Sequence, residues 1–181
     1  MSRTVVVRAP TRIDLGGGWT DVPPYCDREG GFVCNVAIAR HAVVAISDGT
    51  RDAGRGTRSA ESLVDAVRRR MNLGDARIGL DSDFPVAAGL GGSSAAGAAL
   101  LVAASEWKGS RWDRREVAEM GRTIEVEDMG IAGGRQDHYA ATFGGALGLT
   151  FGASTVEVLH LAPSAAAREA LVARCVLIYT G

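Results

Sequence analysis

The sequence is poor in cysteine and has no long apolar run. Its three cysteines, Cys26, Cys34 and Cys175, are odd in number and show no C-x-x-C spacing, so they predict neither a disulfide framework nor a zinc site. We expect buried structural thiols in a reducing compartment. No apolar run reaches the length of about 18 residues that a transmembrane helix needs, and the N-terminus lacks a signal-like apolar region. The sequence therefore predicts a cytoplasmic protein with no membrane partner.

Surplus charge is also missing. The 20 Lys and Arg residues nearly balance the 21 Asp and Glu residues, which gives a formal net charge of −1. Nucleic-acid-binding domains and proteins that bind anionic membranes usually carry a basic patch, and this balance provides none. We therefore expect no nucleic-acid partner.

The residues that are present suit one globular domain. The chain has 181 residues, 46% of them hydrophobic and 23% charged, which is enough apolar material for a core. Glycine is the outlier, with 24 residues, roughly twice the usual share of about 7%. The glycines are clustered, and such clusters indicate places where the backbone comes close to a ligand.

Hydrophobic periodicity predicts an α+β fold. The predicted strands cover residues 5–7, 32–46 (two strands or one long bent one), 76–81, 146–151, 156–161 and 176–179. The predicted helices cover residues 62–71, an Ala/Leu-rich stretch ending near 107, 114–128, a short segment that ends at 144–145, and 165–173.

The densest signal is the glycine-rich segment 89–94, Gly-Leu-Gly-Gly-Ser-Ser. It is no P-loop, because no lysine precedes the serines, and no dinucleotide fingerprint, because Ser94 stands where the third glycine belongs. A nucleophile elbow does not fit either serine. A small-residue turn entering a helix still favours an anion, since the first N–H groups of a helix lack partners. The alternative is a close-packed helix start capped by serine.

Two further groups of residues carry candidate chemistry. Glu125 and Asp137 flank a glycine loop and provide the two carboxylates that phosphoryl transfer requires, one for Mg²⁺ and one beside the attacking hydroxyl. Alternatively, Glu125 belongs to a solvated helix end. Arg12, Asp14 and Asp21 surround a second glycine turn, where they suit either a polyhydroxyl ligand or a salt bridge.

Taken in order, three segments resemble the GHMP kinase superfamily of galactokinase, homoserine kinase and mevalonate kinase. They are Ala9 to Gly18, Pro85 to Ala95, and Glu125 to Asp137 followed by Phe143-Gly144-Gly145. The resemblance implies an α+β fold of the GHMP N-terminal domain, with helices packed on a mixed β-sheet. It also implies ATP as phosphate donor and Mg²⁺ as cofactor.

The resemblance assigns roles residue by residue. Asp137 would be the catalytic residue that accepts the proton of the attacking hydroxyl or orients it, and Arg12 would lie beside it and keep it ionised. Ser94 and Glu125 would bind the metal ion. The ATP site would consist of Pro85, Gly89, Leu90, Gly91, Gly92, Ser93, Ser94 and Ala95, and the substrate site of Gly18, Thr20, Asp21, Gly134 and Gln136.

Finer features point to one branch of the superfamily. The stretch from Gly17 to Tyr25, which contains Gly-Gly-Trp-Thr-Asp-Val-Pro-Pro, is similar to the heptose 7-phosphate kinase and fucokinase branch, as is Gly30 to Ile38. These enzymes phosphorylate an anomeric hydroxyl, so the resemblance implies a sugar kinase. The sequence does not separate the two sugars.

The resemblance also bears on domain organisation. Members of the superfamily carry a second, C-terminal domain, so residues 1–181 are expected to be the N-terminal ATP-binding domain of a fragment or truncated product. The alternative function is a non-catalytic half-domain that binds nucleotide or sugar and needs a partner. Apolar surface left exposed at the domain boundary predicts self-association or a C-terminal partner.

Overall fold

Strand β2 is the centre of a five-stranded sheet in the computed structural model, which describes residues 3–49, 58–85, 87–176 and 178. One edge of β2 pairs with β1 along most of its length, while the other edge pairs with β4 near its start and with β3 near its end. β5 continues the sheet beyond β4. The strands are β1 (Thr4–Gly16), β2 (Gly31–Ser47), β3 (Arg77–Ser82), β4 (Ala146–Phe151) and β5 (Val156–Leu161).

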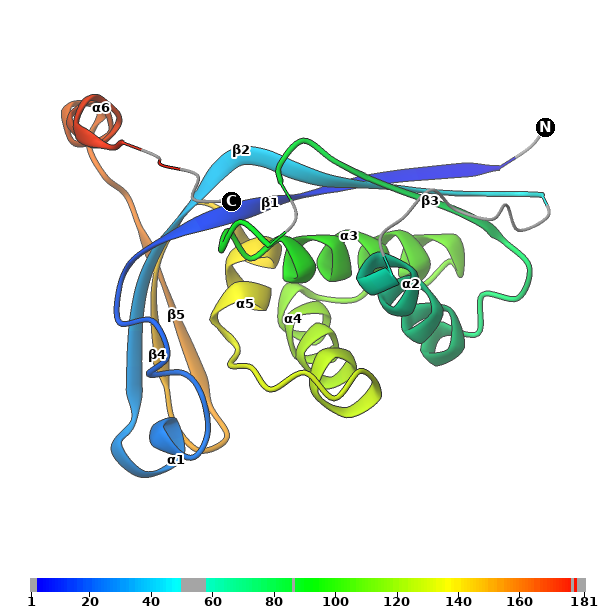
Figure 1. The fold of residues 1–181 in the computed structure, drawn as a ribbon, viewed down its shortest axis with the longest axis horizontal. Coiled ribbons are helices and arrows are strands. Elements are labelled where there is room, and N and C mark those ends of the chain that lie inside the picture. Colours follow the sequence, from blue (N-terminus) through cyan, green and yellow to red (C-terminus); the bar gives the residue numbers. More distant parts are fainter. Residues whose placement is uncertain (1–2, 50–57, 86, 177, 179–181) are drawn as a thin grey trace.

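Helices α2 to α5 lie together on one face of the curved sheet, and α6 stands apart from them (Figure 1). The helical segments are α1 (Tyr25–Glu29), α2 (Arg58–Met71), α3 (Gly92–Trp107), α4 (Arg114–Thr123), the π-helical turn η1 (Ile124–Asp128), α5 (Gln136–Phe143) and α6 (Ala165–Arg174). Because α3 is apolar around nearly its whole circumference, it is buried between the sheet and the other helices. Its alanines allow close packing, which fixes the glycine-rich segment at its start.

The observed elements confirm the α+β class and most predicted positions. Residues 31–47 form one long strand. The described strand pairs are all antiparallel, which corrects the expectation of a mixed sheet. Strand direction depends on partners far apart in the chain, so periodicity alone does not determine it. Of the strand predicted at 176–179, residues 177 and 179 lie outside the described residues.

Two local expectations differ from the structure. The helix predicted over 114–128 is α-helical only as far as Thr123 and continues as the π-helical turn η1. The Asp113–Glu116 capping box fixes the start of α4, but no comparable pattern announces its change to π geometry. Of the three thiols expected to be buried, Cys26 is buried, Cys34 is partly buried and Cys175 is exposed.

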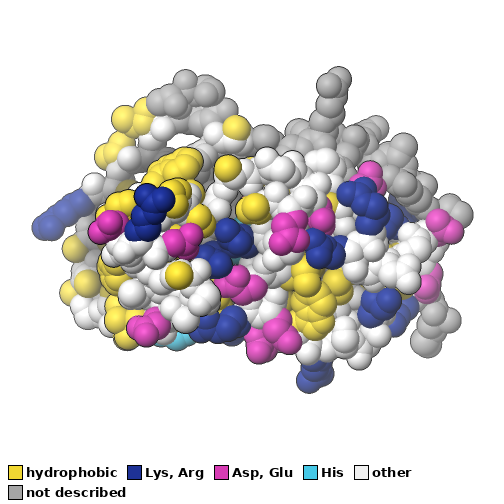
Figure 2. Space-filling view, turned by 90° about the horizontal axis from the view of Figure 1, so that it is seen from below, with side chains coloured by type: hydrophobic (Ala, Val, Ile, Leu, Met, Phe, Trp, Pro, Cys, Tyr) yellow, Lys and Arg dark blue, Asp and Glu magenta, His cyan; other side chains and the backbone are white. Residues whose placement is uncertain are grey.

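The surface is mixed in charge. Viewed from the helical side, acidic and basic side chains are interspersed, as the balanced composition predicts (Figure 2). None of the helices in the described part of the chain combines the length and apolar character needed to cross a bilayer. Apolar side chains lie exposed on the strands, for example Phe32 and Leu159, each more than half exposed. Self-association stays a prediction.

Candidate active site

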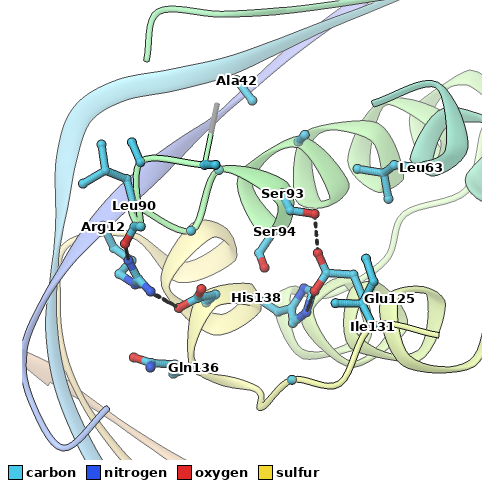
Figure 3. A pocket seen from close by; sticks show the side chains of 18 of the residues that line it. Arg12, Ala42, Leu63, Leu90, Ser93, Ser94, Glu125, Ile131, Gln136 and His138 are labelled. Carbon is cyan, nitrogen blue, oxygen red and sulfur yellow. Dashed lines mark hydrogen bonds and ion pairs between the residues drawn. The ribbon is translucent and has the colours of Figure 1, made fainter. Parts of the chain in front are cut away.

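A cavity of about 880 Å³ lies where the glycine-rich loop before α3 faces η1 and the start of α5. Leu63, Leu80 and Phe84 make one end of its wall apolar, whereas Asp21, Gln136 and Arg12 make another part polar. Figure 3 shows part of this wall from close by, with Leu63, Arg12 and Gln136 labelled, and Ser93 and Ser94 on the first turn of α3. The cavity thus combines an apolar region, the glycine-rich loop and a polar region.

Arg12 joins three parts of the cavity wall. Its Nε and Nη2 lie 2.8 and 2.7 Å from Oδ1 of Asp137, and its Nη1 donates to the carbonyl of Gly89 at 2.6 Å. The backbone N–H of Arg12 also donates to the carbonyl of Leu90. β1, the glycine-rich loop and α5 are therefore tied together by one buried guanidinium, whose planar fork suits a carboxylate.

Gly91 brings the backbone of the glycine-rich loop close to Asp137. Its φ is +70°, and a Cβ there would lie 3.3 Å from the Asp137 carboxylate and 3.5 Å from Cζ of Arg12. The residue is also the N-cap of α3, so the partnerless N–H groups of the helix begin beside the ion pair. Glycine at this position meets both the conformational and the steric requirement.

Asp137 is an unusual partner for an arginine because its pKa is not lowered. Burial raises the pKa of Asp137 above its usual value, and the opposing charge and hydrogen bonds of Arg12 only partly offset this. The contact predicted between the two residues is confirmed, and Arg12 favours the ionised form of Asp137 while burial opposes it. A carboxylate in this state is a stronger base than one in water.

Glu125 lies in η1 and faces the first turn of α3. Ser93 Oγ donates to its Oε1 at 2.5 Å, and Nε2 of His138 lies 3.0 Å from its Oε2 (Figure 3). Burial by itself would raise the pKa of Glu125, but the hydrogen bond and charge of His138, together with the Ser93 hydroxyl, hold it below the usual value. Glu125 therefore stays a carboxylate, and the solvated helix end considered from the sequence is wrong.

The residues present suit a magnesium ion. Ser94 and Glu125 both line the cavity and supply oxygen atoms, the donors that Mg²⁺ prefers. Oε1 of Glu125 accepts the hydrogen bond of Ser93, Oε2 lies beside Nε2 of His138, and each oxygen keeps a second lone pair. No group of three His, Cys, Asp or Glu side chains within the described ranges forms a metal site on its own. Mg²⁺ commonly uses one or two protein ligands and completes its shell with phosphate and water.

Asp21 and Gln136 form the polar part of the cavity wall. Asp21 is 1% exposed, and its Oδ2 accepts from the backbone N–H of Gln136 at 2.8 Å. Its Oδ1 and Oε1 of Gln136 are buried with no partner among the described residues. Gly134 lies against this carboxylate so closely that a Cβ would overlap it. Buried acceptors usually have a donor, and both residues line the cavity, so a ligand that carries hydroxyl groups is a suitable partner for them.

Three predicted site residues do not line the cavity. Thr20 uses its hydroxyl within the fold, where it donates to the Gly17 carbonyl and accepts from the Phe32 N–H. Gly18 packs against the Asp14 side chain, and Ala95 is fully buried in the core. The cavity wall does include the other predicted residues, namely Arg12, Asp21, Pro85, Gly89, Leu90, Gly91, Gly92, Ser93, Ser94, Glu125, Gly134, Gln136 and Asp137.

His138 lines the cavity but is not among the site residues that the sequence predicted. It follows Asp137 and is 3% exposed, yet its imidazole contacts Glu125 rather than solvent or an apolar wall. One signal was available. Gly121 stands inside a helix, where glycine costs about 1 kcal/mol relative to alanine, and it is His138 that fills the space beside it.

Comparison with known proteins finds similarity to one family. The family of GHMP kinases N-terminal domains matches residues 58–145. The D-glycero-alpha-D-manno-heptose 7-phosphate kinase of Campylobacter jejuni is 31% identical over 167 residues, covering 79% of this chain and 49% of that protein. The L-fucokinase/L-fucose-1-P guanylyltransferase of Bacteroides fragilis is 27% identical, covering 76% of this chain and 19% of that protein.

Solved structures agree with this result. A D-glycero-D-manno-heptose 1-phosphate kinase from Bacteroides thetaiotaomicron superimposes with a TM-score of 0.75 at 28% identity, over 91% of this chain and 61% of that one. The mevalonate kinase of Methanococcus jannaschii, at 14% identity and a TM-score of 0.65, shares the fold. The chain spans about half the length of the curated heptose 7-phosphate kinase and about a fifth of the L-fucokinase/guanylyltransferase.

Proposed function

Since the chain carries the N-terminal domain of the GHMP kinases, and so belongs to that family of small-molecule kinases, we propose that it is the nucleotide-binding half of a sugar kinase. The reaction would transfer a phosphoryl group from ATP to a sugar hydroxyl, and the names of the heptose kinase and fucokinase relatives favour the anomeric one. The single observation that carries the proposal is the buried Arg12–Asp137 pair against the glycine-rich loop that starts α3.

The cavity suits ATP along its length. Pro85, residues 87–91 and the first turn of α3 would hold the phosphates, where unpaired N–H groups and the helix dipole favour negative charge. The adenine ring would lie against the apolar wall of Leu63, Leu80 and Phe84. Ser94 and Glu125 would hold Mg²⁺, which neutralises charge on the transferring phosphoryl group when it is bound.

Asp137 would accept the proton of the attacking hydroxyl. The hydroxyl oxygen forms the new bond to the γ-phosphorus, the bond from that phosphorus to the β–γ bridging oxygen breaks, and ADP leaves. Arg12 holds the Asp137 carboxylate through Oδ1, which fixes its direction and leaves Oδ2 for the substrate. Positioning and charge stabilisation would supply most of the rate enhancement, since no covalent intermediate is needed.

The acceptor sugar would bind at Asp21 and Gln136. Their unpartnered oxygens accept hydrogen bonds from hydroxyl groups, and Gly134 leaves room for the Asp21 carboxylate. A heptose phosphate or a fucose-like sugar carries several such hydroxyls. This polar wall therefore supports a polyol acceptor better than an apolar or carboxylate-bearing one.

Replacement of Asp21 by asparagine is expected to raise KM for the sugar about 10- to 100-fold, the value of one hydrogen bond to a charged acceptor. The amide oxygen can still accept from the Gln136 N–H, so the loop keeps its support while the free acceptor is lost. Steady-state kinetics with varied sugar and saturating ATP measure the effect. KM for ATP should change less than about three-fold, and the same replacement at exposed Asp75 should change neither constant.

The proposal is tested by coupled ADP release from MgATP with a panel containing D-glycero-D-manno-heptose 7-phosphate, L-fucose and galactose. Turnover that depends on one sugar establishes the kinase and identifies its acceptor. Saturable MgATP binding without turnover favours the alternative, a half-domain that binds ligands and needs a partner. Absence of both turnover and nucleotide binding would refute the phosphate-loop assignment.

A further inference from the structure

We propose that His138 is a positioning residue, which orients the Glu125 carboxylate for the metal ion of the bound nucleotide, and that Gly121 makes room for its ring. This inference rests on the proposed function. It assigns to the residue after Asp137 a task distinct from proton transfer. It also links α5 to α4 and to η1, which directly continues α4.

The contact is direct and shielded from water. Nε2 of His138 lies 3.0 Å from Oε2 of Glu125, and the two side chains are only 4% and 13% exposed. Ser93 holds the other carboxylate oxygen, so each oxygen of Glu125 has its own donor, one from α5 and one from α3 (Figure 3). Two donors on opposite oxygens fix the plane of a carboxylate, which one donor does not.

The position of His138 in the chain gives the contact its significance. Asp137 and His138 are neighbours in the first turn of α5, and their side chains diverge, Asp137 to Arg12 and His138 to Glu125. The proton acceptor and the metal carboxylate are therefore fastened to the same helical turn. Hydrogen-bond partners of metal-binding carboxylates typically alter metal affinity about 10- to 100-fold when they are removed.

Gly121 provides independent support from another helix. It is buried in α4, and a Cβ at this position would lie 2.8 Å from Nδ1 of His138, closer than real Cβ contacts. A methyl group would push the imidazole away from α4 and disturb its approach to Glu125. Gly97 in α3 is a matched comparison, since a Cβ there would meet only a methyl group of Leu63, at 4.0 Å.

The test measures the affinity of the 181-residue chain for ATP by calorimetry, once with excess Mg²⁺ and once in EDTA. The readout is the dissociation constant in EDTA divided by the dissociation constant in Mg²⁺. This ratio reports coupling between metal and nucleotide and requires no turnover. His138→Leu and Gly121→Ala are expected to lower this ratio about ten-fold or more while the EDTA value stays within about two-fold. His138→Gln keeps a donor, so its ratio should stay within about three-fold of the ratio for the unmodified chain.

His160→Leu and Gly97→Ala serve as controls and should leave the ratio unchanged, and circular dichroism verifies that each variant is folded. Should His138→Leu fail to fold, Gly121→Ala and His138→Gln still decide the question. A folded His138→Leu or Gly121→Ala chain with an unmodified ratio would overturn the inference and leave the proposed function intact. A His138→Gln chain with a ratio as low as that of His138→Leu would overturn the inference in the same way. An unmodified chain that binds no nucleotide would overturn the proposed function itself and this inference with it.

Discussion

Asparagine in place of Asp137 is expected to lower kcat by about 10²- to 10⁴-fold, the usual contribution of a positioned general base. The amide keeps the shape of the carboxylate and can still accept from Arg12, so nucleotide affinity should change less than about three-fold. Steady-state ADP release measures kcat, and calorimetry measures the affinity. Asp75→Asn is the matched control on the surface.

The same carboxylate sets the acidic limb of the pH profile. Only the ionised form accepts a proton, so kcat/KM falls as the pH drops through the pKa of Asp137 in the folded protein. Because burial outweighs Arg12 and raises that pKa, the fall should occur above the usual range of an aspartate, nearer to neutral pH. An Asp137→Asn variant that retained turnover within about three-fold would remove this residue from the chemistry.

Methionine in place of Arg12 is expected to reduce kcat/KM about 100-fold or more and to lower the free energy of unfolding by about 3 kcal/mol. Methionine fills a similar volume, but Asp137 loses its cation while its side chain is only 28% exposed, and the Gly89 carbonyl loses its donor. A buried carboxylate without a partner is costly, and the glycine-rich loop loses its link to α5. Chemical denaturation and steady-state kinetics measure the two effects.

A double-mutant cycle separates the two roles of Arg12. In the Arg12→Met/Asp137→Asn chain both charges of the pair are gone, so much of the lost stability should return while turnover stays low. Strict additivity of the two stability losses would contradict the coupling seen between the side chains. Arg12→Lys retains the charge but not the planar fork of the guanidinium. Its kcat/KM and free energy of unfolding are expected to lie between those of the unmodified chain and of Arg12→Met.

Several parts of the site were predictable because they depend on short segments. The glycine-rich segment 89–94 precedes a helix, and Asp137 begins one, as local turn and periodicity signals indicated. The pairing of Arg12 with Asp137, 125 positions apart, came from the family resemblance, since spacing alone contains no such information. The balance between burial and Arg12 at Asp137 was not predictable, because burial depends on packing from every side.

Other features had no local signal. Periodicity predicted a helix through Glu125, but the wider π turn that aims this residue at Ser93 reflects packing between η1 and its neighbours. Thr20 looked like a substrate residue within its motif, yet its hydroxyl is used by the backbone of Gly17 and Phe32. Residues that hold a loop and residues that face a ligand share one motif, and only the fold separates them.

The position of β2 has a consequence for synthesis on the ribosome. The hairpin of β1 and β2 is complete by residue 47, but the edge of β2 at Gly31–Val36 finds its partner only when Ala146–Phe151 has been made. At about 5–20 residues per second, that delay of roughly 100 residues lasts about 5–20 seconds. Throughout it an unpaired strand edge is open to pairing with other nascent chains. β2, which joins β1 to β4 in the sheet, is thus a strand for which chaperone protection is useful during synthesis.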